Sequence, residues 1–304
     1  MTCAVSLSTM WARGRYSSVG EFAGKAREWG FTHIEGNVFI SSRQMLDELA
    51  GGPLPISSLH CPCPNPTGPT GVPASRLSLS SIDKEERGQA LRFARETIDA
   101  AARLGARAVI LHMGEVPLGS SSQDRLRHLW QRDLAGSQEY RSTKEQLLSR
   151  RSFAAPPFVD TALQSLGELS RYSEQRGVLL GVETRVYIHE IPDIDEMQRL
   201  LSEVGSKSVG YWHDVGHAEV QHRLGITPHH EWLSRFRDRM IGIHLHDILG
   251  VTDHCCPGAG DLDWAMIASS LPPGMIKVCE IGEWNDETHM PGAIAFLRRQ
   301  GILT

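Results

Sequence analysis

Acidic and histidine side chains recur along this sequence at the points where short apolar runs end. In the stretch YWHDVGH, residues 211–217, an aspartate and a histidine three positions apart follow the apolar run SVGYW. Carboxylates and imidazoles act as general acids and bases and as ligands of divalent cations. A single such group is most often a hydrogen-bonded structural residue, so the recurrence is what matters. Other runs end at or near His60, His112, Glu183, His244, His246 and Glu280.

Buried acids and imidazoles in such number are costly unless they share a partner, and a divalent cation is the natural one. Glu183, Asp214, His244 and Glu280 end four successive runs and would offer three carboxylates and one imidazole. This donor set suits one Mn²⁺, Co²⁺ or Mg²⁺ ion, and Zn²⁺ or Ni²⁺ would also fit. His244 and His246 point to the same side of one strand, and we predict that His244 is the ligand.

The apolar runs are predicted to be strands that alternate with helices. Strands are expected at residues 3–7, 32–36, 56–60, 107–113, 178–183, 209–214, 240–246 and 276–281. Helices are expected at residues 19–29, 42–50, 83–104, 159–176, 193–204, 228–238, 263–271 and 287–300. Asp83, Asp160, Asp193 and Asp263 are the predicted N-caps.

Eight β-then-α units predict an α/β fold, a single (β/α)8 TIM barrel over residues 1–304. An open doubly wound sheet is disfavoured because no G-x-G-x-x-G phosphate loop follows the first run. In a barrel the carboxyl ends of the strands meet at one mouth, where the acids and histidines would converge.

Residues 114–158 are too long for a simple connection between the fourth strand and the next helix. Between residues 124 and 151 there are seven Lys or Arg against four Asp or Glu, and the segment has a helical pattern. We expect a helical insertion that forms a solvated cover over the barrel rim. The alternative is a lid or a homodimer contact that carries an anion-binding arginine.

Composition limits the classes of function. The net charge of −5 argues against a nucleic-acid partner, and no apolar run approaches a membrane span. The first residues make a poor signal peptide, so a cytoplasmic location is expected. Six cysteines do not make a disulfide framework. Cys3 and Cys279 are expected to be reduced core residues, and Cys61, Cys63, Cys255 and Cys256 to be reduced loop residues rather than a zinc site, because their spacing is wrong.

Five motifs in order, LGVETR, WHDVGHA, IHLHDILG, DHCCPGAGDLDW and VCEIGE, resemble the xylose-isomerase-like barrels. That group includes sugar isomerases, ketose 3-epimerases, inosose dehydratases and endonuclease-IV-type enzymes. The resemblance covers the third to eighth predicted strands. It implies that Glu183, Asp214, His244 and Glu280 hold the metal and that His217 lies near the substrate. Relatives often have lysine at the position of His246, so its role departs from their pattern.

The expected chemistry is proton abstraction next to a carbonyl on a small polyhydroxylated substrate, such as a sugar, cyclitol or keto acid. Epimerisation, isomerisation and dehydration share this first half. The predicted catalytic residues are Glu183, Glu280 and His217. The predicted substrate contacts are His60, His112, Arg185, Glu190, His246 and His254.

Two other functions remain open. An endonuclease-IV-like phosphodiesterase with several zinc ions would use many of the same residues. The acidic net charge speaks against it, as does the lack of an Asp-x-His pair, since Asp253 directly precedes His254. The second alternative is a metal-binding barrel without catalysis.

Overall fold

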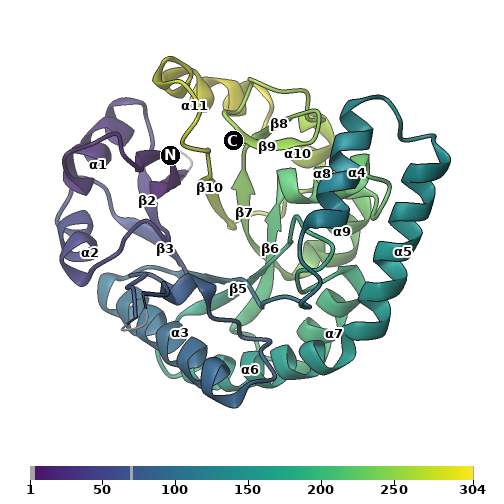
Figure 1. The fold of residues 1–304 in the computed structure, drawn as a ribbon. Helices are drawn as coiled ribbons and strands as arrows, with labels where there is room; N and C mark the ends of the chain where they lie inside the picture. Colours follow the sequence, from purple (N-terminus) through teal and green to yellow (C-terminus); the bar gives the residue numbers. More distant parts are fainter. Residues whose placement is uncertain (1–3, 69–70, 304) are drawn as a thin grey trace.

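Eight parallel strands close into a barrel in the computed structural model, which describes residues 4–68 and 71–303 (Figure 1). Their order around the barrel is β1-β10-β7-β6-β5-β4-β3-β2, and β1 pairs with β10 to close it. The strands are β1 Ser6–Ser8, β2 His33–Gly36, β3 Ile56–His60, β4 Ala108–Leu111, β5 Leu179–Glu183, β6 Val209–Asp214, β7 Met240–Leu245 and β10 Ile276–Cys279. The predicted (β/α)8 barrel is therefore confirmed.

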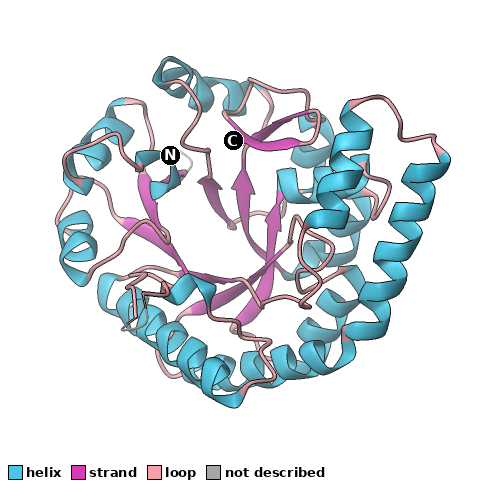
Figure 2. Cartoon of the chain, viewed as in Figure 1, coloured by secondary structure: helices cyan, strands magenta, loops and turns pink. Residues whose placement is uncertain are grey.

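Helices surround the strands on the outside, as the cyan ring around the magenta strands in Figure 2 shows. They are α1 Val19–Glu28, α2 Arg43–Ala50, α3 Lys84–Leu104, α4 Ser121–Gln131, α5 Gln138–Ala154, α6 Pro156–Glu174, α7 Ile194–Val204, α8 Val215–Arg223, α9 His229–Phe236, α10 Trp264–Ser270 and α11 Met290–Arg299. The main apolar core lies between this ring and the barrel. In the part of the chain that the structure describes, no helix is long and apolar enough to cross a membrane.

The inside of the barrel is filled around one large side chain, Trp212, which is fully buried. Ala108, Ile110, Ile276 and Val278 pack with it in a separate cluster. Two glycines provide the room: a Cβ atom would lie 2.1 Å from the Trp212 ring at Gly242 and 2.8 Å from it at Gly181. The indole also meets the ring of His244, at 5.3 Å between centroids, so it forms the floor of the barrel mouth.

Most predicted element ends are correct to within one to three residues, and one predicted cap is wrong. Asp83, Asp193 and Asp263 each cap a helix by accepting backbone N–H groups. Asp160 does not, because α6 begins earlier, at Pro156. Proline is favoured in the first turn, where its missing N–H costs nothing.

One helix and one small sheet at the strand ends were not predicted. Helix α8 follows β6 without a loop, and Asp214 is both the last strand residue and the N-cap of the helix. A two-stranded antiparallel sheet, β8 Asp247–Leu249 and β9 Thr252–Cys255, follows β7. Both additions lie where strands end, at the predicted mouth.

The expected insertion is helical and consists of α4 and α5, at the right of Figure 1. Its predicted boundary at residue 158 lies inside α6. The side chain of Gln123 donates to the carbonyl of Val186 at 2.7 Å and accepts from the N–H of Ile188 at 2.6 Å. Arg151 donates from Nε to the carbonyl of Ile188 at 2.7 Å. These contacts tie both helices to the loop after β5.

Candidate metal centre

Four side chains from four successive strands of the barrel wall meet in its mouth. Glu183, Asp214, His244 and Glu280 each offer one ligand atom, and these atoms all lie within 4.8 Å of one another. Nδ1 of His244 is central: it lies 2.6 Å from Oε1 of Glu183, 3.1 Å from Oε2 of Glu280 and 3.6 Å from Oδ2 of Asp214. Glu183 and Asp214 end β5 and β6, while Glu280 directly follows β10. These are the four residues predicted as metal ligands.

The cluster favours a positive charge at its centre. Burial lowers the pKa of His244, but Glu280, Glu35 and Glu183 outweigh it and hold this pKa well above its usual value. One carboxylate oxygen, Oδ2 of Asp214, is buried and has no hydrogen-bond partner among the described residues. Such an orphaned acceptor, facing an imidazole nitrogen and two further carboxylates, fits a divalent cation.

Glu35 at β2 is a fifth member of the cluster that the sequence analysis missed. Its carboxylate is fully buried, lies 3.2 Å from Nε2 of His244, and accepts a 2.8 Å hydrogen bond from Ser58. An acid that accepts the second N–H of a metal-binding imidazole fixes the ring's orientation and raises its basicity. The sequence feature that could have identified Glu35 is its place in THIEG, near the end of the second predicted strand.

Glu183 is held from above by cationic and imidazole side chains. Nη1 of Arg185 donates to its Oε2 at 2.7 Å, and Nε2 of His112 lies 2.6 Å from the same oxygen. Burial raises the pKa of Glu183, but His112 and His244 reverse the effect and hold it well below its usual range. Arg185 also binds Glu190, with Nη2 to Oε1 at 2.6 Å. Glu183 is therefore a fixed anion.

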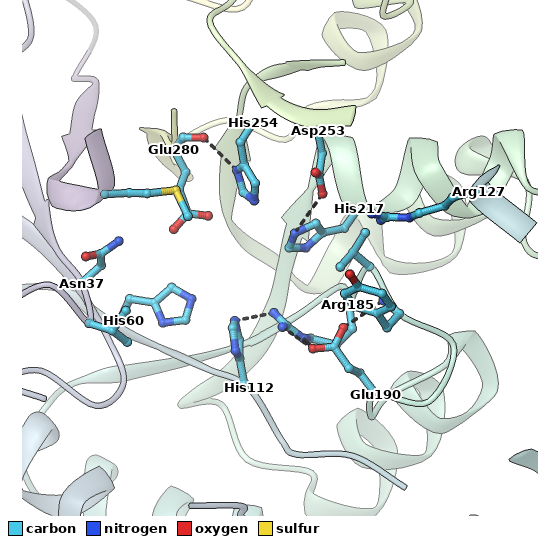
Figure 3. A pocket seen from close by; sticks show the side chains of 14 residues that line it. Asn37, His60, His112, Arg127, Arg185, Glu190, His217, Asp253, His254 and Glu280 are labelled. Carbon is cyan, nitrogen blue, oxygen red and sulfur yellow. Dashed lines mark hydrogen bonds and ion pairs between the residues drawn. The ribbon is translucent and has the colours of Figure 1, made fainter. Parts of the chain in front are cut away.

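A cavity of about 330 Å³ adjoins the cluster through Glu280, which is among the lining side chains drawn in Figure 3. Its walls include most of the predicted substrate contacts and the histidine predicted to be catalytic: His60, His112, Arg185, Glu190, His217 and His254. Of the four predicted metal ligands, only Glu280 also lines it. Burial, together with Arg185 and His60, lowers the pKa of His112 to about 4, so its ring is neutral at neutral pH.

The structure places His246 beneath the cavity, where it orients Asp214. Its Nδ1 accepts a 2.8 Å hydrogen bond from the backbone N–H of His254. The proton is therefore on Nε2, which lies 2.9 Å from Oδ1 of Asp214. The ring is fully buried and does not line the cavity. His246, which we expected to contact the substrate, therefore does not reach the cavity in this arrangement.

A second group of possible ligands stands beside the first and consists of His217, Asp253 and His254. Neighbouring strand residues normally point to opposite faces. His254 has a φ of 57°, in the left-handed region, and this turn brings its side chain and that of Asp253 to the same place. Asp253 and His254 therefore lie together as the two residues of an Asp-x-His pair would. The lack of that sequence pair no longer argues against a site with several metal ions. His60, His112 and Glu183 form a third group.

The loop PGAGDLDW, residues 257–264, is organised by Asp247. Its carboxylate accepts hydrogen bonds from the N–H groups of Ile248, Gly258 and Leu262 and from Nε1 of Trp264, at 2.8 to 3.2 Å. The backbone runs so close that a Cβ atom at Gly260 would lie 2.2 Å from a carbonyl oxygen.

The cysteines form no cluster among the described residues. Cys61, Cys63, Cys255, Cys256 and Cys279 are free, and burial raises the pKa of each. Cys279 lies in the core, as expected. Cys63 and Cys256 lie outside the helices and strands, as expected, and both are buried. Cys3 lies outside the described residues.

Comparisons with known proteins agree with this architecture. Residues 23–300 match the family model described as xylose isomerase-like TIM barrel. The uncharacterized protein y4fM of Sinorhizobium fredii (strain NBRC 101917 / NGR234) is 26% identical over 265 residues, which cover 81% of this chain and 74% of the relative. The structure of a D-tagatose 3-epimerase-like protein matches 99% of this chain and 97% of its own, with a TM-score of 0.68 and 16% identity. The structure of 3-keto-D-glucoside 4-epimerase, YcjR, from E. coli matches 98% of this chain and 99% of the epimerase chain, with a TM-score of 0.67 and 14% identity.

Proposed function

Because the chain belongs to the xylose isomerase-like TIM barrel family, we propose that it is a metal-dependent isomerase or epimerase of a small polyhydroxylated carbonyl compound. The observation that carries the proposal is the convergence of Glu183, Asp214, His244 and Glu280 beneath a cavity of small-molecule size. The similarity of the fold to that of sugar epimerases agrees with it.

These four residues would hold one divalent cation, with Mn²⁺, Co²⁺ or Mg²⁺ preferred for a site of three carboxylates and one imidazole. Such an ion polarises a carbonyl and acidifies the neighbouring C–H bond. Glu35 orients the imidazole of His244 from the far side, and His246 does the same for Asp214.

Glu280 is the proposed general base. It is 4% exposed and lines the cavity, whereas Glu183 is fully buried and already bound by Arg185. Burial raises the pKa of Glu280, but the opposite effect of His244, His254 and His60 is larger, so the net result is a lowered pKa. The carboxylate is therefore ionised and can accept a proton. In this scheme Glu183 serves mainly as a ligand, which narrows the catalytic role predicted for it.

The remaining polar walls of the cavity would hold the substrate's hydroxyl groups. His60, His112, His217 and His254 line it, and imidazole side chains can hydrogen-bond to hydroxyl groups. Nδ1 of His217 donates to the carbonyl of Thr184 at 2.9 Å, and its Nε2 lies 3.8 Å from Oδ2 of Asp253. Arg185 and Glu190 would contribute through the outer face of their ion pair.

A dehydratase of the same fold would share the first step, the abstraction of a proton. Its substrate would then lose a β-hydroxyl group instead of being reprotonated. A phosphodiesterase with several metal ions is the second candidate, favoured by the three adjacent groups of possible ligands. The net charge of −5 disfavours a nucleic-acid substrate.

Two measurements test the proposal. Metal analysis of protein purified without chelator should give one equivalent of Mn or Co, while three equivalents of Zn would favour the phosphodiesterase. In heavy water, a panel of ketoses and keto-cyclitols should incorporate deuterium next to the carbonyl, and a chelator should abolish this. Absence of exchange across the panel, together with metal-dependent nicking of abasic DNA, would refute the isomerase.

A further inference from the structure

Arg127 of α4 is partly exposed, and it differs from the buried arginines Arg151 and Arg185 in its hydrogen bonds. Its Nε and Nη2 atoms are buried, and neither has a hydrogen-bond partner among the described residues. Arg151, in the adjoining helix α5, instead uses all three nitrogens on carbonyl groups and on Glu196. Arg185 likewise binds Glu183 and Glu190. Buried donors without a partner are costly, so Nε and Nη2 of Arg127 call for an acceptor that comes from elsewhere.

The position of Arg127 is fixed. Gln123, one helical turn earlier on the same face of α4, is hydrogen-bonded to the backbone of Val186 and Ile188. The guanidinium carbon of Arg127 lies 5.0 Å from the ring centroid of Tyr187, in a cation–π contact. The side chain is thus held in place before any ligand binds, which lowers the entropy cost of recognition.

The guanidinium lines the same cavity as Glu280 and the histidines. Figure 3 shows its side chain extending from α4 towards His217. The charge of Arg185 in the cavity wall is balanced by Glu183 and Glu190. Asp253 lies close enough for its charge to attract that of Arg127, but no carboxylate of the described residues is hydrogen-bonded or ion-paired to the Arg127 guanidinium. A ligand over the metal cluster would therefore meet a guanidinium with free donors.

The two free nitrogens define the ligand chemistry. Nε and Nη2 form one edge of the planar guanidinium, and this edge binds the two oxygens of a carboxylate side by side. Glu190, Asp253 and Glu280 line the same cavity and would repel a dianionic phosphate more than a singly charged carboxylate.

We infer that Arg127 binds a carboxylate group of the substrate, which makes the substrate a polyhydroxylated acid rather than a neutral sugar. The inference rests on the proposed function in one respect, that the cavity is the substrate site. The carboxylate would lie at the α4 side of the cavity, and the reacting carbon near Glu280.

Calorimetry with metal-loaded protein tests this inference on matched pairs: D-glucuronate against D-glucose, D-galacturonate against D-galactose, and D-gluconate against D-glucitol. D-glucose 6-phosphate is the phosphate probe. At least one acid should bind about 10- to 100-fold more tightly than its neutral partner, the effect of one charge-assisted contact. Arg127→Gln should abolish the preference without changing the metal affinity or the melting temperature. Arg125→Gln is the control, since Arg125 is exposed on the same helix and pairs with Glu139.

Equal binding within all three pairs, or a preference that Arg127→Gln leaves intact, overturns the inference. So does tighter, Arg127-dependent binding of the phosphate, which would assign a phosphosugar instead. An Arg127-dependent preference for acids without any deuterium exchange leaves the inference standing and removes the proposed reaction. Chelator-sensitive exchange into neutral ketoses, together with equal binding within all three pairs, leaves the proposed reaction standing and removes the inference.

Discussion

Glu35 and His244 face each other across the inside of the barrel, with Oε1 3.2 Å from Nε2, although 209 residues separate them in the chain. Glu35 lies in β2 and His244 in β7, and both are fully buried. The other ring nitrogen of His244 faces the carboxylates of Glu183 and Glu280. One imidazole thus joins an orienting acid on one side to the metal-binding acids on the other.

Glu35→Gln is expected to weaken metal binding by about 10- to 100-fold, the usual effect of losing such an orienting acid. The amide can still accept a hydrogen bond from His244, but it lacks the charge that raises the imidazole's basicity. Titration of metal-free protein with Mn²⁺ measures the affinity. Glu231→Gln, at an exposed position of α9, is the control. An unchanged affinity in Glu35→Gln would mean that Glu35 serves the fold alone.

Glu280→Gln is expected to lower kcat with a much smaller effect on KM. The amide keeps an oxygen near the metal but cannot accept the substrate proton, and proton transfer counts mainly in the transition state. Steady-state kinetics and deuterium exchange on the best substrate measure both effects. If Glu280→Gln keeps the wild-type exchange rate, a residue other than Glu280 is the general base.

His229 is predicted to make stability depend on pH below about 6.5. It is buried, its Nδ1 lies 2.9 Å from Glu219, and its Nε2 lies 3.0 Å from Nε2 of His213. Since the two facing nitrogens share one hydrogen bond, only one of them carries a proton. Burial lowers the pKa of His229, and burial and His229 lower that of His213.

The sign follows from proton uptake. Below the unfolded pKa of about 6.5, the unfolded chain gains protons that the folded one still excludes, so stability falls as the pH falls. In that pH range each ring lowers the free energy of unfolding by about 1.4 kcal/mol for each pH unit. Urea unfolding of chelator-treated protein between pH 7.5 and 5 should show a smaller decline for His229→Gln. His230→Gln, exposed on the same helix, should behave as wild type.

Asp247→Asn is expected to destabilise the protein by roughly 3 kcal/mol, because the new NH₂ group faces donors that previously had a carboxylate oxygen. Gly258 N–H and Nε1 of Trp264 both donate to Oδ2 of Asp247. Urea unfolding measures the loss. Asp238→Asn, at an exposed position, should change stability little. Equal stability of the two variants would show that the loop does not depend on this carboxylate.

The sequence predicted the barrel and the four converging ligands for one reason: each ligand lies at the end of its own apolar run, and parallel strands in a closed barrel bring those ends together. It could not predict that Asp253 and His254 face the same way. That arrangement depends on a left-handed backbone at a histidine, which no residue pattern requires. Nor does a helical pattern distinguish Arg127, which lines the cavity, from Arg125, which faces solvent.

Trp212, the indole that fills the barrel below the cluster, gives the protein an optical reporter of its own centre. It is one of seven tryptophans. Its ring is fully buried and meets the ring of His244 at 5.3 Å between centroids. A paramagnetic ion such as Mn²⁺ or Co²⁺ held by that imidazole would quench fluorescence from this indole at very short range. The part of the emission that metal quenches in wild type and not in Trp212→Phe therefore reports occupancy of the centre directly, without any substrate.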